Sequence, residues 1–128
     1  QKDPSVIEAA YNDKAGVTAE FNLNLLTRIN RETGANFDLS RWQHRAIYNS
    51  EAGRIEMYLI SATDQTVRIY DRQFHFRASE KILTEHSYKH TPEGFIALAR
   101  QAGFDFVRLW TDDARLFGVF YFSCTRGR

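Results

Sequence analysis

Residues 83–95 read LTEHSYKHTPEGF, and the spacing of apolar and polar residues changes in the middle of this stretch. The part before Pro92 alternates, which predicts a β-strand, whereas the part after it has the spacing of a helix. Because side chains two apart on a strand point to the same face, Glu85 and Ser87 should lie side by side. Their neighbours, Thr84 among them, should point to the other face. We therefore expect a carboxylate and a hydroxyl together on a strand that leads to a helix start.

The sequence before this stretch predicts two helices. Asp3-Pro4 is typical of a helix start and predicts a short helix through Ala10. A second helix should run from about residue 18 to the stop signal at Gly34. Its buried face should be a row of apolar residues spaced four apart, with one neighbour that widens it: Phe21, Leu25 and Ile29, with Leu26.

From residue 42 the period changes to two, which predicts strands at residues 42–49, 54–61, 66–70, 73–77 and 82–89. A helix from Pro92 to its cap at Gly103 and a final hairpin of residues 106–111 and 117–124 complete the chain. We expect an α+β fold, in which a helical hairpin packs on an antiparallel sheet and is followed by a helix and a terminal β-hairpin. Seven aromatic residues of this last part should belong to the core: Phe104, Phe106, Trp110, Phe117, Phe120, Tyr121 and Phe122.

The whole chain, 128 residues with a formal net charge of +1, has the size and balance of one globular domain. This charge gives no reason to expect nucleic acid or an anionic membrane as a partner, and no stretch has the length of a membrane span. A lone cysteine in an apolar run, Cys124, predicts a buried thiol in a reducing compartment, so we expect a cytoplasmic protein. His86 and His90 should lie at a strand end and not on one helical turn, so no metal site is expected.

The carboxylate of Glu85 has two interpretations. Since a lone buried charge is costly, a carboxylate that points inward should form a salt bridge, for example with Arg54 or Arg68. Alternatively, it is held beside Ser87 to bind a ligand with two polar groups. Spacing alone does not choose between the two.

Three long stretches resemble the C-terminal portion of the histidine-specific, SAM-dependent methyltransferases, which include the enzyme that trimethylates the α-amino group of histidine in ergothioneine biosynthesis. They are AAYNDKAGVTAEFNLNLLTRINRETGANFDL (residues 9–39), NSEAGRIEMYL (49–59) and ILTEHSYKHTPEGF (82–95). The resemblance extends over residues 3–123. It implies that Tyr11 contacts the amino-acid end of the substrate and that Met57 lines the pocket. It also implies that Glu85 and Ser87 hold the imidazole ring, one at each ring nitrogen.

The resemblance further implies direct methyl transfer from S-adenosyl-L-methionine (SAM) to the neutral α-amine of histidine. No glycine-rich SAM loop is present in the sequence, so we expect a substrate-recognition fragment of a larger enzyme, inactive alone and without a bound cofactor. Within one domain, residues 3–91 should be the recognition region and 92–124 the end of a class I methyltransferase sheet. Two alternatives stay open: a non-catalytic binding module for a histidine-like ligand, and a diverged methyltransferase for another aromatic amine.

The same resemblance suggests a homodimer. If the last hairpin belongs to a sheet whose other strands lie elsewhere, its edge exposes unpaired backbone groups. The uncharged stretch FGVFYFSC, residues 117–124, makes this edge prone to pairing with another chain. We therefore expect contact between two copies through residues 104–124. Alternatively, the helix from Pro92 and the hairpin fold back on the antiparallel sheet and bury this edge within one chain.

Overall fold

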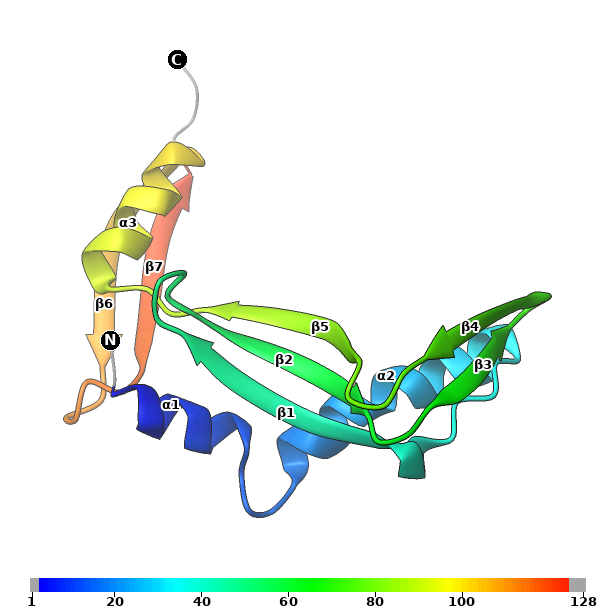
Figure 1. The fold of residues 1–128 in the computed structure, drawn as a ribbon. Coiled ribbons are helices and arrows are strands. Elements are labelled where there is room, and N and C mark those ends of the chain that lie inside the picture. The colour runs from blue at the N-terminus through cyan, green and yellow to red at the C-terminus, as the bar shows by residue number, and fades with distance from the viewer. Residues whose placement is uncertain (1–2, 125–128) are drawn as a thin grey trace. The chain divides into compact units, whose positions relative to one another are not determined.

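A computed structural model describes residues 3–124 and divides them into two compact units, residues 3–88 and 89–124 (Figure 1). The elements are helices and antiparallel strands in both units, which confirms the predicted α+β fold class. No helix among residues 3–124 is both long enough and apolar enough to cross a membrane.

Both helices of the first unit begin where the sequence predicts. Helix α1 (Pro4–Tyr11) is capped by Asp3, whose carboxylate accepts a hydrogen bond from the backbone N–H of Ser5 at 2.9 Å. Helix α2 (Val17–Thr33) is followed by Gly34, whose positive φ of 66° ends it in a conformation that favours glycine.

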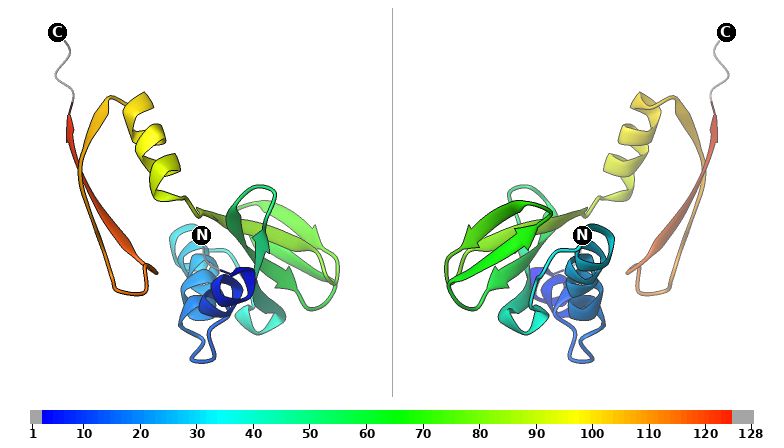
Figure 2. Two further views of the ribbon diagram at one scale, coloured as in Figure 1. Left: turned by 90° about the vertical axis from the view of Figure 1, so that its left-hand side faces the viewer. Right: turned by 90° about the vertical axis from the view of Figure 1, so that its right-hand side faces the viewer.

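The sheet of this unit has three antiparallel strands in the order β1 (Trp42–Asn49), β2 (Arg54–Ser61) and β5 (Lys81–Tyr88). A 3-10 turn (Leu39–Arg41) precedes it, and β3 (Gln65–Ile69) and β4 (Arg72–Phe76) pair as a separate hairpin. The views in Figure 2 place α1 and α2 on the same face of the three-stranded sheet. The five strands predicted for this unit are therefore confirmed, with boundaries within one residue.

The core of the first unit lies between these helices and β2, where every second residue is buried. Ile55, Met57 and Leu59 of β2 are at most 1% exposed. From α2, however, the buried residues are Asn22 and Leu26. Part of the predicted apolar row of this helix was wrong, since Phe21 is 66% exposed and Leu25 is 40% exposed. The helix is turned so that a polar residue occupies the buried face, because the Asn22 amide finds hydrogen-bond partners there.

Strand β5 contains a bulge at the point where the candidate residues lie. Met57 pairs with Glu85 while the next residue of β2, Tyr58, pairs with Leu83, so Thr84 is an extra residue. Its hydroxyl donates a hydrogen bond to the backbone carbonyl of Met57 at 3.0 Å. The bulge places Thr84 on the same cavity wall as Glu85. The expectation that these two neighbours face opposite sides, which assumed a regular strand, was therefore wrong.

The second unit consists of α3 (Pro92–Gln101), β6 (Phe104–Thr111) and β7 (Gly118–Cys124). The Thr91 hydroxyl caps α3 by accepting from the backbone N–H of Gly94 at 3.1 Å. Phe95 of α3 packs against the hairpin, with ring centroids 5.0 Å from Phe120 and 5.8 Å from Phe122. These rings, together with Phe106, are the half-buried ones of this unit.

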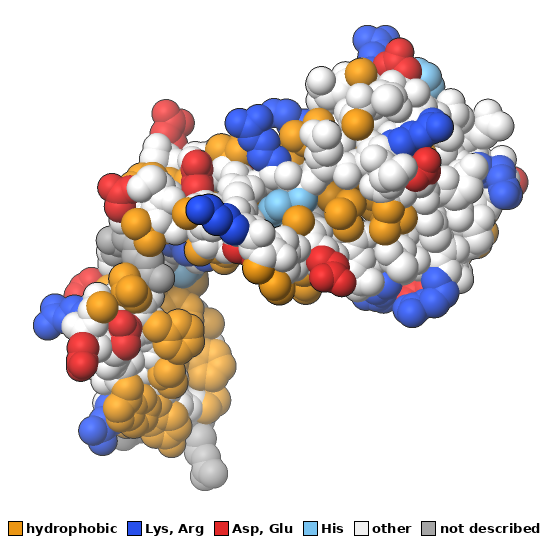
Figure 3. All heavy atoms as spheres, turned by 90° about the horizontal axis from the view of Figure 1, so that it is seen from below, with side chains coloured by type: hydrophobic (Ala, Val, Ile, Leu, Met, Phe, Trp, Pro, Cys, Tyr) orange, Lys and Arg blue, Asp and Glu red, His pale blue; other side chains and the backbone are white. Residues whose placement is uncertain are grey.

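The other four aromatic residues predicted for the core are exposed, and this part of the prediction was wrong. They are Phe104, Trp110, Phe117 and Tyr121, which are 43%, 44%, 71% and 56% exposed. Cys124 is exposed too, contrary to the expectation of a buried thiol. For Trp110 and Tyr121 the reason is that α3 covers one face of a two-stranded hairpin, and no described residue of this unit covers the other. Figure 3 shows hydrophobic side chains gathered on this unit, at the lower left.

Candidate functional site

The four candidate residues lie together on the helix-covered face of the three-stranded sheet. The hydroxyl of Tyr11, the last residue of α1, is 2.8 Å from the Ser87 hydroxyl on β5. Glu85 pairs directly with Met57 across β2 and β5, and paired residues point to the same face. Tyr11 also packs against the buried cluster that contains Met57. Residues separated by up to 76 positions in the sequence therefore meet at one place.

Tyr11 is held there because α1 is bound to the free edge of β1. The Glu8 carboxylate accepts from the backbone N–H of Tyr48 at 2.7 Å. The Asn12 side chain accepts from the N–H of Ala46 and donates to its carbonyl, both at 2.9 Å. These side chains use the backbone groups that a further strand would otherwise pair, so the end of α1 is fixed against the sheet.

The salt bridge considered for Glu85 is not formed. Arg54 pairs with Glu56 at 2.8 Å, and Arg68 donates to the carbonyl of Tyr70 at 3.3 Å. Among residues 3–124, no side chain forms an ion pair or hydrogen bond with the exposed carboxylate of Glu85. This carboxylate is therefore available to a ligand.

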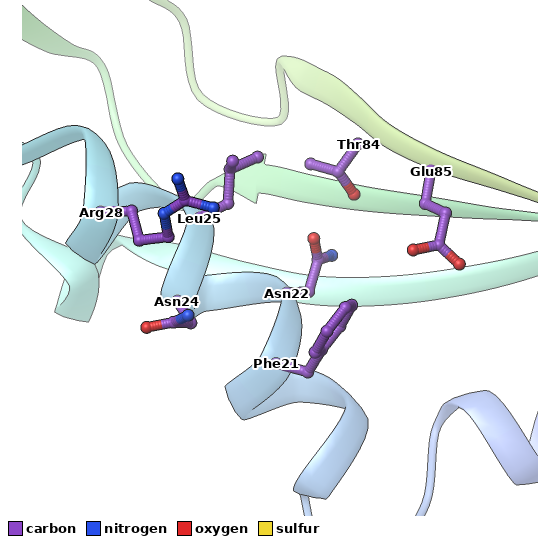
Figure 4. Close-up of a pocket in the computed structure, with 7 residues that line it drawn as sticks. All are labelled: Phe21, Asn22, Asn24, Leu25, Arg28, Thr84 and Glu85. Carbon is purple, nitrogen blue, oxygen red and sulfur yellow. The ribbon is translucent and has the colours of Figure 1, made fainter.

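A cavity of about 210 Å³ lies beside Glu85, between α2 and β5 (Figure 4). Seven residues line it: Phe21, Asn22, Asn24, Leu25, Arg28, Thr84 and Glu85. Figure 4 shows Asn22 and Phe21 pointing from α2 toward the side of the strands where Thr84 and Glu85 lie. An aromatic ring and a carboxylate at one end of a cavity suit a flat ligand with a polar edge.

The opposite face of the sheet carries a second polar cluster, centred on Glu56. Its carboxylate accepts hydrogen bonds from the Tyr58 hydroxyl, from Arg54 and from Asn49. The Tyr58 hydroxyl first, and then Arg54, lower the pKa of Glu56 from 4.5 to about 2. Because every member has a partner within the cluster, we interpret it as a connection between neighbouring strands and not as a binding site.

The two histidines with metal-like spacing contact aromatic rings. His86 lies 6.2 Å from Tyr88 and His90 lies 5.6 Å from Phe95, measured between ring centroids. Within the part of the chain that the structure describes, no three His, Cys, Asp or Glu side chains gather as metal ligands would.

Comparison with known proteins gives a consistent result. The sequence profile of a family described as histidine-specific methyltransferase, SAM-dependent, matches residues 1–124. The chain belongs to the histidine-specific, SAM-dependent methyltransferases. It is 45% identical over 120 residues to histidine N-alpha-methyltransferase of Mycolicibacterium smegmatis and 44% identical to that of Mycobacterium tuberculosis. Each match covers 92% of this chain. Ergothioneine biosynthesis protein 1 of Schizosaccharomyces pombe is 30% identical over 89 residues, which is 69% of this chain and 12% of that protein.

The chain spans 37% of the length of the two bacterial relatives. Residues 3–124 contain no strand that passes through a glycine-rich loop into a helix, the arrangement that holds such a cofactor's charged groups. The described residues therefore do not provide this arrangement for SAM by themselves.

Sequence reasoning missed three residues of the cavity that lie next to Glu85: Phe21, Asn22 and Thr84. Phe21 and Asn22 were missed because a fixed spacing of four assigned the wrong side of α2 to the core. A polar residue within the buried stripe of an amphipathic helix was the available signal for Asn22. A bulge such as that at Thr84 leaves no comparable mark in a single sequence.

Proposed function

We propose that this chain is the substrate-recognition part of an enzyme that transfers methyl groups from SAM to the α-amino group of histidine. The observation that carries this proposal is the unpaired Glu85 carboxylate. It stands two residues from Ser87, on the face where Ser87 meets Tyr11. The names of the bacterial relatives support the same reaction.

In this proposal the imidazole ring lies along β5. Glu85 accepts a hydrogen bond from one ring N–H, and the Ser87 hydroxyl serves the other ring nitrogen. Tyr11 contacts the amino-acid end of the substrate, and Met57 packs beneath the ring. These four residues bind and orient the substrate. SAM, bound by another part of the full-length protein, supplies the methyl group. The enzyme works in the cytoplasm.

Glu85→Ala in the full-length protein tests the proposal. The N–H of bound histidine loses a charged acceptor, so we expect affinity to fall by about 10- to 150-fold, which corresponds to about 1.5–3 kcal/mol. Ligands whose rings cannot donate a hydrogen bond should gain affinity relative to histidine. In the variant they no longer displace water from a carboxylate that they cannot pair with. Glu51→Ala, in the exposed turn between β1 and β2, is the matched control and should leave both unchanged. Unaltered affinity and ring preference in Glu85→Ala contradict the proposed role.

A non-catalytic binding module and a methyltransferase for another aromatic amine are the competing outcomes. Histidine binding by a full-length protein that shows no SAM binding in calorimetry supports the first. Methyl transfer to an indole-containing amine in preference to histidine supports the second.

We also propose that the chain of residues 1–128, when isolated, associates through residues 104–124. One face of the β6–β7 hairpin supports this contact, since Val119 and Tyr121 are 51% and 56% exposed. The arrangement buries apolar surface that α3 leaves uncovered.

A further inference from the structure

The orientation of the Asn22 side chain is fixed by its partners. Asn22 is 3% exposed, and its Nδ2 lies 3.1 Å from the backbone carbonyl of Tyr58 and 3.0 Å from His44 Nδ1. A backbone carbonyl can only accept, so the atom that faces Tyr58 must be the amide nitrogen. The two amide hydrogens of Asn22 are therefore used by Tyr58 and by His44.

This orientation also fixes the tautomer of His44. Its Nδ1 accepts from Asn22, so the ring hydrogen is on Nε2, which donates to the backbone carbonyl of Tyr11 at 2.8 Å. Tyr11 is the residue whose hydroxyl meets Ser87. A continuous set of hydrogen bonds thus connects the candidate residue of α1 with the buried amide of α2.

The carbonyl oxygen of Asn22 remains, and no hydrogen bond among residues 3–124 uses it. Asn22 lines the cavity together with Thr84 and Glu85. The Thr84 hydroxyl already donates to Met57, so toward a ligand its oxygen can only accept. The Glu85 carboxylate, when ionised, is also an acceptor without a donor. The guanidinium of Arg28 lies six residues further along α2, where Glu32 accepts from its Nε.

We propose that Asn22 is a further substrate-contacting residue, and that its carbonyl oxygen together with Glu85 selects a flat ring that presents an N–H. This inference rests on the proposed function and adds a residue and a rule to it. Two acceptors in a half-enclosed site reward a donor. A ring whose nitrogen can only accept should bind more weakly than a ring without nitrogen. The reason is that acceptors facing each other repel and lose water without compensation.

Binding of three ligands to the wild-type full-length protein, measured by calorimetry at alkaline pH, tests the rule. Histidine has a ring N–H, 2-thienylalanine has no ring nitrogen, and 3-pyridylalanine has a ring nitrogen that only accepts. We expect affinity to fall in that order, with pyridylalanine about 10-fold weaker than thienylalanine. Pyridylalanine binding as tightly as thienylalanine, or more tightly, overturns the inference. If histidine itself does not bind, the proposed function is contradicted as well as this inference. Histidine binding therefore distinguishes a failure of the inference alone from a failure of both.

Asn22→Leu, which is similar in size, assigns the effect to this residue. We expect the gap between thienylalanine and pyridylalanine to shrink by about 3- to 10-fold, while the KM for SAM stays unchanged. A general loss of structure would not produce such a split. An unchanged gap in a folded Asn22→Leu protein overturns the assignment.

If Asn22→Leu does not fold, an NMR titration of the wild-type protein tests the assignment, with the side-chain amide signal of Asn22 as the readout. Histidine should shift this signal and thienylalanine should shift it much less. A signal that histidine leaves in place overturns the inference.

Discussion

The two units of this chain are built from the same kinds of elements but differ in what they bury. Residues 3–88 contain several side chains that are almost fully enclosed, among them Leu26, Ile55 and Leu59. In residues 89–124, by contrast, no described residue is buried, and α3 covers one face of a two-stranded hairpin. The candidate residues lie entirely in the first unit. The candidate residues thus lie in the unit with the denser packing.

The largest effect should follow removal of a core side chain from the first unit. Leu59 is 0% exposed, so Leu59→Ala should lower the free energy of unfolding of this unit by about 2–5 kcal/mol. Leu98 of α3, which is 48% exposed, provides the matched control. Leu98→Ala should change the free energy of unfolding of the second unit by about 0.5 kcal/mol. Hydrogen exchange of peptides from β2 and α3 in the full-length protein measures both. Equal effects of the two substitutions contradict the difference described here.

A smaller effect, on assembly, should come from the uncovered face of the hairpin. Tyr121 pairs with Arg108 on the face away from Phe95, so Tyr121→Lys should turn a dimer of the isolated chain into a monomer and leave its circular dichroism unchanged. Light scattering over a concentration series measures this. Phe120→Lys is the comparison: it removes a ring that packs on Phe95 and should damage the unit itself. A wild-type chain that stays monomeric at high concentration contradicts the proposed contact.

The sequence predicted the elements well because each has a strong local cause. The Asp3-Pro4 start, the Gly34 stop and the alternation of β2 act over a few residues, and all were confirmed. The aromatic residues of the last hairpin were predicted less well. Their apolar character indicates that they need a partner surface, but it does not show whether the described part of the chain supplies one.

The same limit applies to the site. Alternation placed Glu85 and Ser87 on one face, and their pairing with β2 agrees with this. It failed at Thr84, because a bulge depends on the register between two strands and not on either strand alone. Helical spacing failed at Asn22, whose burial depends on acceptors contributed by His44 and Tyr58, more than 20 residues away. The roles of Tyr11, Met57, Glu85 and Ser87 as ligand contacts stay predictions.

The Glu56 cluster should make the stability of the first unit sensitive to acid. The pKa of Glu56 is lowered from 4.5 to about 2, so its ionised form stabilises the folded unit above pH 4.5. This contribution should be lost as the pH falls from about 4.5 to about 2. Glu56→Gln should be less stable than the wild type at neutral pH, and it should lose less stability on acidification. Thermal unfolding as a function of pH measures both. Parallel curves for the wild type and Glu56→Gln would show that this carboxylate does not contribute.

The smallest effect should come from the cap of α3, and it tests whether the second unit depends on local interactions. Thr91→Ala removes the acceptor for the N–H of Gly94 and should destabilise α3 by about 1 kcal/mol. Since α3 has no buried residue, little packing opposes fraying, and faster hydrogen exchange should extend beyond the first turn. Thr91→Ser keeps the hydroxyl and should restore protection. If exchange in Thr91→Ala rises only at the first turn, packing on Phe120 and Phe122 holds this helix more firmly than its exposure indicates. The two units would then differ less in stability than in burial.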